Sequence, residues 1–268
     1  MKQQDNSEVQ HVIQQRLSAI EEKHDVHILL AVESGSRAWG FASPDSDWDV
    51  RFLYVHRLPW YLSVHAGRDV IESGIEQHPL GELDINGWEL RKSLQLLHKS
   101  NPALLEWLQS PIVYRKDEVA FARYVHLAQV FFKPQASFHH YVSMAHTNHR
   151  EFLKKDLVKL KKYLYVLRPI FACLWMEKFN TMPPIEFPRL LDQLLPSGEL
   201  RLEIDELLRK KRLAGEGEVA PQIPAISQFI DTELTRIKQV HFAVAEMSKQ
   251  QYAGCDQFLM DTVLHASN

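Results

Sequence analysis

The chain has 268 residues and a formal net charge of −3, with 31 Lys and Arg against 34 Asp and Glu. This balance gives no bulk electrostatic sign of a nucleic-acid partner, although it leaves room for a local basic patch. Hydrophobic residues make up 45% and charged residues 24% of the chain, which excludes a disordered protein. No apolar run approaches the roughly 20 residues of a membrane helix, the N-terminus lacks a signal-peptide core, and Cys173 and Cys255 are far apart. We therefore expect a cytoplasmic protein with reduced thiols and no membrane partner.

The N-terminal part of the sequence predicts a small mixed β-sheet preceded by one helix. Apolar residues recur at helical spacing over residues 6–23, and a short aliphatic strand follows over 26–33. A Ser-, Pro- and Asp-containing loop leads to a second strand over 48–55. A third strand is expected around 83–86, with a weaker candidate near 70–71.

Beyond this point the patterns are helical, so the sequence predicts an α+β chain with a helical C-terminal part. Prolines interrupt the helical pattern over residues 180–188, and residues 213–224 are expected to form a mobile surface loop. We place a small mixed-sheet domain at residues 1–110 and an all-helical domain at residues 111–268. The clearest helical patterns cover residues 88–100, 101–110, 116–132, 137–156 and 157–179.

Three aspartates predict a metal site. Asp47 and Asp49 would share one face of a strand, because strand side chains alternate with period two. Like charges held together repel unless a cation lies between them, and a hard divalent ion such as Mg²⁺ prefers carboxylate oxygens. Asp84 supplies a third carboxylate from a neighbouring strand. Three such groups can hold two metal ions, an arrangement that suits phosphoryl transfer.

A Gly-Ser pair upstream of these aspartates predicts an anion site. If the first strand ends at Gly35 and Ser36 and a helix follows, backbone N–H groups and the helix dipole would point at an anion. Gly35 would let the backbone approach a phosphate, while Ser36 and Arg37 would add donors. The alternative is that Gly35 is an ordinary turn glycine, Asp45 and Asp47 cap the loop, and Asp84 is exposed on an edge strand. The order and spacing of these features together favour the functional interpretation.

A basic stretch in the helical part is a second candidate region. Lys161, Tyr165 and Arg168 would lie on one face of a helix, with Lys162 beside them, and could meet a triphosphate. The alternative is a solvated basic face with a core-packed tyrosine.

Other side chains lie near the aspartates in sequence. Arg51 alternates onto the face of Asp49 and could steady a carboxylate or a phosphate. Trp39, Trp48 and Trp88 could stack on a base, although core packing is the simpler role for each of them.

The stretch "SGSRAWGFASPDSDWDVRF" resembles the G-S…D-x-D signature of the polymerase-β-type nucleotidyltransferase superfamily, and Asp84 matches its third strand carboxylate. More narrowly, this stretch with "LDINGWEL", "NPALLEWL" and "KKYLYVLRPIFACLW" resembles the predicted bacterial nucleotidyltransferases associated with RNA-repair pathways. The first resemblance covers about the first 90 residues and the second extends to about Phe179.

The resemblance implies transfer of a nucleoside monophosphate from a nucleoside triphosphate such as ATP to a hydroxyl, with release of pyrophosphate. Gly35 and Ser36 would hold the triphosphate, Asp47 and Asp49 would bind two Mg²⁺ ions, or Mn²⁺ in their place, and Asp84 would bind the catalytic metal. RNA as acceptor rests on the narrower resemblance. A nucleotide-binding or regulatory module that has lost catalysis, and a transferase acting on a protein or a small molecule, stay open, as do the nucleotide and the oligomeric state.

Overall fold

The structure is a computed structural model that describes residues 2–65, 67–79, 81–155, 157–213, 218–242 and 249–267. The chain divides into two compact units, the first formed by residues 1–35, 47–132 and 246–268 and the second by residues 36–46 and 133–245. This division differs from the predicted boundary after residue 110. The reason is that helix α6 (Glu118–Phe131) and the C-terminal helix α12 (Lys249–Ser267) pack with the strands of the first unit.

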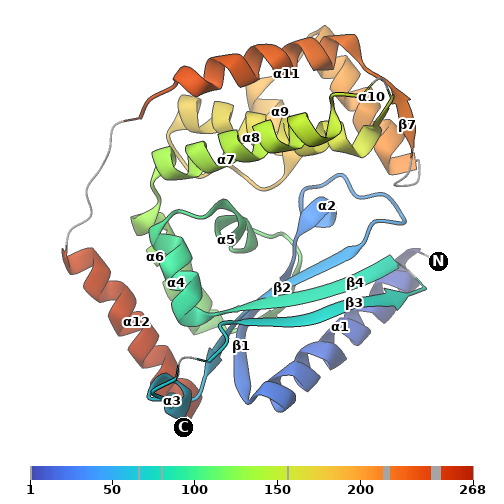
Figure 1. Cartoon of the computed structure of the whole chain (residues 1–268). Coiled ribbons are helices and arrows are strands. Elements are labelled where there is room, and N and C mark those ends of the chain that lie inside the picture. The colour runs from blue at the N-terminus through green and yellow to red at the C-terminus, as the bar shows by residue number, and fades with distance from the viewer. Residues whose placement is uncertain are drawn as a thin grey trace. The chain divides into compact units, whose positions relative to one another are not determined.

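The first unit is built on a five-stranded mixed sheet with the order β3-β4-β2-β1-β5 (Figure 1). The strands are β1 (Val26–Glu33), β2 (Trp48–His56), β3 (Val70–His78), β4 (Gly81–Glu89) and β5 (Val113–Lys116). β2 and β4 are parallel, and the other pairs are antiparallel. The four strands predicted from the sequence are confirmed. β5 was not predicted, because four residues are too few to show a strand pattern.

One face of this sheet is covered by α1 (Lys2–His24), which lies along the strands in Figure 1. Its apolar residues Val9, Ile13 and Leu17 are buried in one cluster with Val50 and Phe52 of β2. The apolar residues that recur at helical spacing in the sequence thus form the buried face of α1. The unit also contains three shorter helices, α3 (Leu58–Tyr61), α4 (Leu90–His98) and α5 (Pro102–Trp107).

The second unit is helical, with one small two-stranded sheet. Its elements are α7 (Pro134–Phe152), β6 (Leu157–Lys159), α8 (Leu160–Phe179), α9 (Phe187–Leu194), α10 (Glu199–Leu213), β7 (Val219–Pro221), α11 (Pro224–Arg236) and the 3₁₀ turn η1 (Ile237–Gln239). Residues 157–159, predicted as helix, instead pair with β7. Of the predicted loop 213–224, residues 214–217 lie outside the described residues. In the part of the chain that the structure describes, no helix is both long and apolar enough to span a membrane.

Candidate functional site

The parallel pairing of β2 and β4 brings two of the predicted carboxylates side by side. Asp49 on β2 is paired in register with Asp84 on β4. Their neighbours Val50 and Ile85 are buried in the core beside α1, and successive strand residues point to opposite faces. Asp49 and Asp84 therefore lie on the face turned away from α1, with side chains 31% and 25% exposed.

Arg51 provides a cation between these carboxylates. Its Nη2 donates to Asp84 Oδ2 at 2.7 Å and to Asp49 Oδ1 at 3.3 Å, and its Nη1 donates to the backbone oxygen of Asp84 at 2.9 Å. The other Asp84 oxygen, Oδ1, accepts from Asn86 Nδ2 at 2.6 Å. The expectation that Arg51 steadies a carboxylate is confirmed, and the mutual repulsion of Asp49 and Asp84 is offset by its charge.

Glu33, at the end of β1, is a buried carboxylate that the sequence analysis missed. It is fully buried, and its Oε1 accepts from the backbone N–H of Asp49 at 2.9 Å. The Tyr114 hydroxyl donates to Oε2 at 2.5 Å, and Ser34 N donates to the backbone oxygen of Asp49 at 2.8 Å. Glu33 thus fixes the backbone of Asp49. The sequence does contain a sign of this role, because Glu33 is the one charged residue in the aliphatic run "VHILLAVE" and stands at its end.

Gly35 lies directly against Asp49. Its φ is +61°, and a Cβ built there would lie 2.1 Å from Asp49 Oδ2, so any other residue would strain the backbone and force the Asp49 carboxylate to move. The helix after it, α2 (Gly35–Ala38), has four residues, so its dipole is far weaker than the sequence analysis expected. Ser36 is buried, and Arg37 Nη2 donates to the backbone oxygen of Ser46 at 2.6 Å.

Asp47 is exposed and lies one residue before β2 begins, so the strand does not fix its direction. Among the residues that the structure describes, no three His, Cys, Asp or Glu side chains form a metal-binding group. The structure therefore joins Asp49 and Asp84 through Arg51, and it does not assemble all three aspartates. The two-metal site stays a prediction.

The segment 36–46 packs within the second unit. The Trp39 ring lies 4.5 Å from the Arg168 guanidinium carbon and edge-on to Tyr165, with ring centroids 5.8 Å apart. The backbone N–H of Phe187 donates to the Trp39 oxygen at 2.9 Å. The loop that follows the Gly-Ser pair is thus held by α8 and α9.

A buried lysine holds the other half of this segment. Lys211 of α10 is 3% exposed, and its Nζ lies 2.6 Å from Ser43 Oγ and 3.4 Å from Ser46 Oγ. The two hydroxyls, 3.0 Å apart, are also buried. Next to it, Arg212 Nη2 donates to the Gly40 oxygen at 3.3 Å. Nothing in the local sequence identifies Lys211, since it stands within the basic run "RKKR".

The predicted basic residues of α8 differ in exposure. Arg168 is only 3% exposed, and its Nε donates to the Ile185 oxygen at 3.2 Å. Lys161, Lys162 and Tyr165 are partly exposed, and Lys162 Nζ lies over the Tyr165 ring at 4.8 Å. Arg168 therefore serves packing of the Trp39 segment, while the two lysines keep access to solvent.

The three tryptophans considered for base stacking have different surroundings. Trp48 is buried in the core beside α1, and Trp39 is packed against Arg168. Trp88 is partly exposed on the Asp84 face of β4 and stacks on Trp107, with ring centroids 4.0 Å apart.

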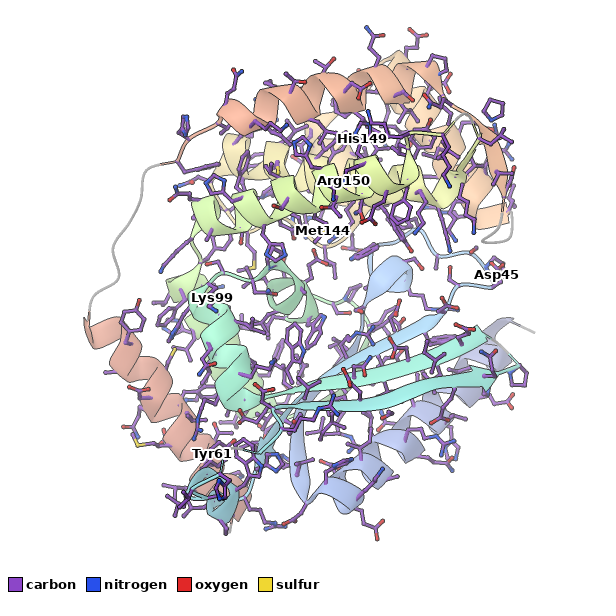
Figure 2. The ribbon with its side chains drawn as sticks, in the orientation of Figure 1. Asp45, Tyr61, Lys99, Met144, His149 and Arg150 are labelled. Atoms are coloured by element: carbon purple, nitrogen blue, oxygen red, sulfur yellow. The ribbon has the colours of Figure 1, made fainter. Side chains whose placement is uncertain are left out.

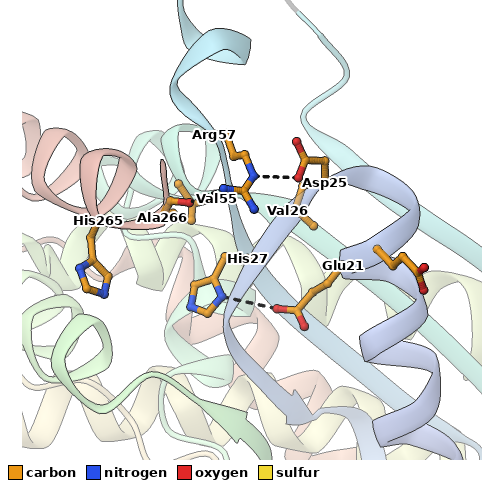
Figure 3. A pocket seen from close by; sticks show the side chains of 9 residues that line it. Glu21, Asp25, Val26, His27, Val55, Arg57, His265 and Ala266 are labelled. Carbon is orange, nitrogen blue, oxygen red and sulfur yellow. Dashed lines mark hydrogen bonds and ion pairs between the residues drawn. The ribbon is translucent and has the colours of Figure 1, made fainter. Parts of the chain in front are cut away.

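A separate cavity of about 590 Å³ lies in the first unit, lined by residues of α1, β1, β2 and α12 (Figure 3). Arg57 Nε donates to Asp25 Oδ1 at 2.8 Å, and His27 Nδ1 lies 3.6 Å from Glu21 Oε1. None of the predicted site residues lines it, so this cavity is not the candidate site.

Comparison with known proteins covers both units. A family model, RlaP, described as the RNA repair pathway DNA polymerase beta family, matches residues 9–261. The Bacillus subtilis (strain 168) protein named "Uncharacterized protein YcgL" is 47% identical over 247 residues, or 92% of this chain and 94% of that protein. Both matches extend well past residue 110, so the similarity covers residues of both units.

A solved structure of a nucleotidyltransferase-like protein from Exiguobacterium sibiricum is also similar. It covers 95% of this chain and 77% of that chain, with 13% identity and a TM-score of 0.32.

Proposed function

The chain belongs to the RNA repair pathway DNA polymerase beta family, and from this premise we propose that it transfers a nucleoside monophosphate from a nucleoside triphosphate to a hydroxyl acceptor. The acceptor oxygen bonds to the α-phosphorus as the bond to the β-phosphate oxygen breaks. Pyrophosphate leaves, and the hydroxyl proton passes to a base or to solvent.

The observation that carries this proposal is the in-register Asp49–Asp84 pair with a cation between its carboxylates. The position that Arg51 holds is one that a metal ion could share, because carboxylate oxygens are the donors that Mg²⁺ prefers. The carboxylate chemistry of this pair therefore supports the proposed metal. Asp49 and Asp84 would hold it, with Asp47 joining from the adjacent loop.

Each remaining residue then has a positioning task. Mg²⁺, when bound, would offset the charge on the transferring phosphoryl group. Glu33 and Gly35 fix where the Asp49 carboxylate stands. Ser36 and Arg37 would bind triphosphate oxygens, and Lys161 and Lys162 are accessible for the same purpose. The family resemblance assigns to Asp84 the additional role of drawing the proton from the acceptor hydroxyl.

Arg51 also supports one alternative. A guanidinium that already neutralises Asp49 and Asp84 could replace the metals outright, leaving a module that binds nucleotide without transfer. In a catalytic protein, the metal must instead compete with or displace this contact.

The experiment that separates these functions uses the purified protein, Mg²⁺ and each α-labelled nucleoside triphosphate in turn. RNA, the protein alone and a panel of small hydroxyl compounds such as aminoglycosides serve as acceptors. Pyrophosphate release and the position of the label are both followed, with Asp49→Asn as the inactive control and Asp45→Asn as the matched control for a nearby exposed aspartate.

Label on RNA that Asp49→Asn loses and Asp45→Asn keeps supports the proposal with RNA as acceptor. Label on the protein or a small molecule keeps the reaction and changes the acceptor. Triphosphate binding without pyrophosphate release supports the binding module instead. In that case an electron paramagnetic resonance titration should show no Mn²⁺ binding to the protein.

A further inference from the structure

One segment of the second unit has a charge opposite to that of the whole chain. Residues 150–162 contain six Lys or Arg and two Asp or Glu, a formal charge of +4 within a chain of −3. The segment runs from the last turn of α7 through β6 into the first turn of α8. The balanced overall charge therefore conceals a local concentration of cations.

Packing turns these cations outward. Three apolar residues of the segment are buried: Leu153 at 6%, Val158 at 1% and Leu160 at 3% exposed. The cationic side chains between them are exposed, namely Lys154, Lys155 and Lys159. Arg150, one turn before, is exposed on α7 (Figure 2). We refer to Arg150, Lys154, Lys155 and Lys159 as the basic surface.

The backbone that carries the basic surface is fixed by neighbouring elements. Gln222 Nε2 donates to the backbone oxygens of Leu153 at 3.3 Å and Lys155 at 3.0 Å. β6 pairs with β7, and Leu160 N donates to the Glu218 oxygen at 3.0 Å. The cations therefore need no backbone ordering on binding, which lowers the entropic cost of meeting a partner.

The four cations also keep their charge available. Within the described part of the chain, none of the four side chains of the basic surface lies in an ion pair with a carboxylate. Some other exposed cations are paired with a carboxylate, as Arg209 is with Glu206 at 2.7 Å. A fixed group of unneutralised cations suits a partner with repeated negative charges.

We propose that the basic surface binds the sugar-phosphate backbone of a polynucleotide acceptor, RNA in the first instance. This inference rests on the proposed function and specifies its acceptor class. Lys161 and Arg168 follow on α8, about 10 Å apart along the helix axis, and Arg168 contacts Trp39 in the segment that also carries Ser36 and Arg37. The partly exposed Lys161 thus follows the basic surface on α8, and the same helix holds the segment that carries Ser36 and Arg37 through the buried Arg168.

The test measures RNA binding directly, without requiring transfer. Anisotropy of a short fluorescein-labelled single-stranded RNA is followed for the full chain between about 50 and 200 mM salt. The test variant combines R150Q, K154Q, K155Q and K159Q. The matched control combines K23Q, K99Q, K210Q and K238Q, four exposed lysines outside the basic surface whose replacement changes the net charge equally. ATP binding and the melting temperature of each variant are also measured.

The test variant should bind RNA at least about tenfold more weakly, and its slope of log K against log salt should be shallower by about 0.7 per lost phosphate contact. ATP binding and melting should match the unmodified protein, and the control should keep its RNA affinity. An equal loss of RNA affinity in the test variant and the control would mean that the net charge alone decides binding, and this would overturn the proposal. So would RNA-independent binding to phosphatidylserine vesicles that only the test variant loses, since the partner would then be a membrane surface.

The two proposals fail in different ways. RNA binding through the basic surface without nucleotidyl transfer would overturn the proposed function alone. Transfer to RNA with an unchanged affinity in the test variant would overturn the basic surface alone.

Discussion

The two regions that carry the candidate site residues are held by different kinds of interaction. Asp49, Asp84 and Arg51 stand on adjacent strands, where register alone decides that they meet. Segment 36–46 has no strand or long helix, and it depends on single contacts from α8, α9 and α10, such as that of Lys211. The first region is robust because many backbone hydrogen bonds fix it. The second is sensitive to individual side chains.

The largest effect should follow from a change in the strand-borne region. Asp84→Asn keeps the shape and the Asn86 contact but removes the negative charge, so transfer should fall by roughly 10³-fold or more. The melting temperature should change little. Steady-state pyrophosphate release and thermal unfolding check this, and activity within about tenfold of the unmodified protein would remove Asp84 from the catalytic set.

The second effect concerns the contact-dependent region. Lys211→Met keeps most of the buried chain length and removes the ammonium group that meets Ser43 and Ser46, which should cost about 2 kcal/mol of unfolding free energy. Urea unfolding measures this. The KM for the triphosphate should rise more than kcat falls, because Ser36 and Arg37 lie in the loosened segment.

The control for this variant is its neighbour. Lys210 is exposed, so Lys210→Met should stay within about 0.5 kcal/mol of the unmodified protein. Equal losses in the two variants would mean that Lys211 does not hold the segment.

A smaller effect is expected at Glu33. Glu33→Gln keeps an acceptor for the Asp49 N–H but loses the charge, and Tyr114→Phe removes the donor on the other oxygen. Each change should cost about 1–2 kcal/mol, and a double-mutant cycle should show a coupling of about 1 kcal/mol. Additive losses would show that the Tyr114–Glu33 contact contributes nothing of its own.

The smallest effect is a pH dependence at the far end of β2. Burial, together with the nearby His24, lowers the pKa of His56 from 6.5 to about 4, against the opposing effect of Asp25. The unfolded chain therefore takes up a proton first, and stability should fall by on the order of 1 kcal/mol from pH 7 to about pH 5. Urea midpoints across this range check it, and His56→Gln should flatten the change. An equal slope in that variant would assign the effect to other groups.

The sequence predicted the strand-borne region because its signals are local. Alternation placed Arg51 with Asp49, and the apolar run around Asp84 marked the adjacent strand. The sequence placed Asp84 on a neighbouring strand, and the structure supplied the parallel, in-register pairing with Asp49.

The rest of the site depends on contacts between residues distant in sequence. Glu33 and Tyr114, or Ser43 and Lys211, meet only after the chain has folded, and neither pair has a spacing that alternation or helical period can reveal. The division of the described chain into two units differs from the predicted domain boundary for the same reason. Helix α12 returns to the first unit from the end of the chain, and nothing in its own residues says so.

The parallel register of β2 and β4 has a consequence for how this family can vary. Deleting one residue from β4 ahead of Asp84 would turn that carboxylate toward α1 and put an apolar side chain in its place, because faces alternate along a strand. A substitution can thus change one side chain of the site and leave the others in place. A change of length within either strand instead moves a carboxylate to the opposite face and removes it from the site. Members of this family should accordingly carry insertions and deletions in the connections between strands. The number of residues within β2 and within β4 should stay the same.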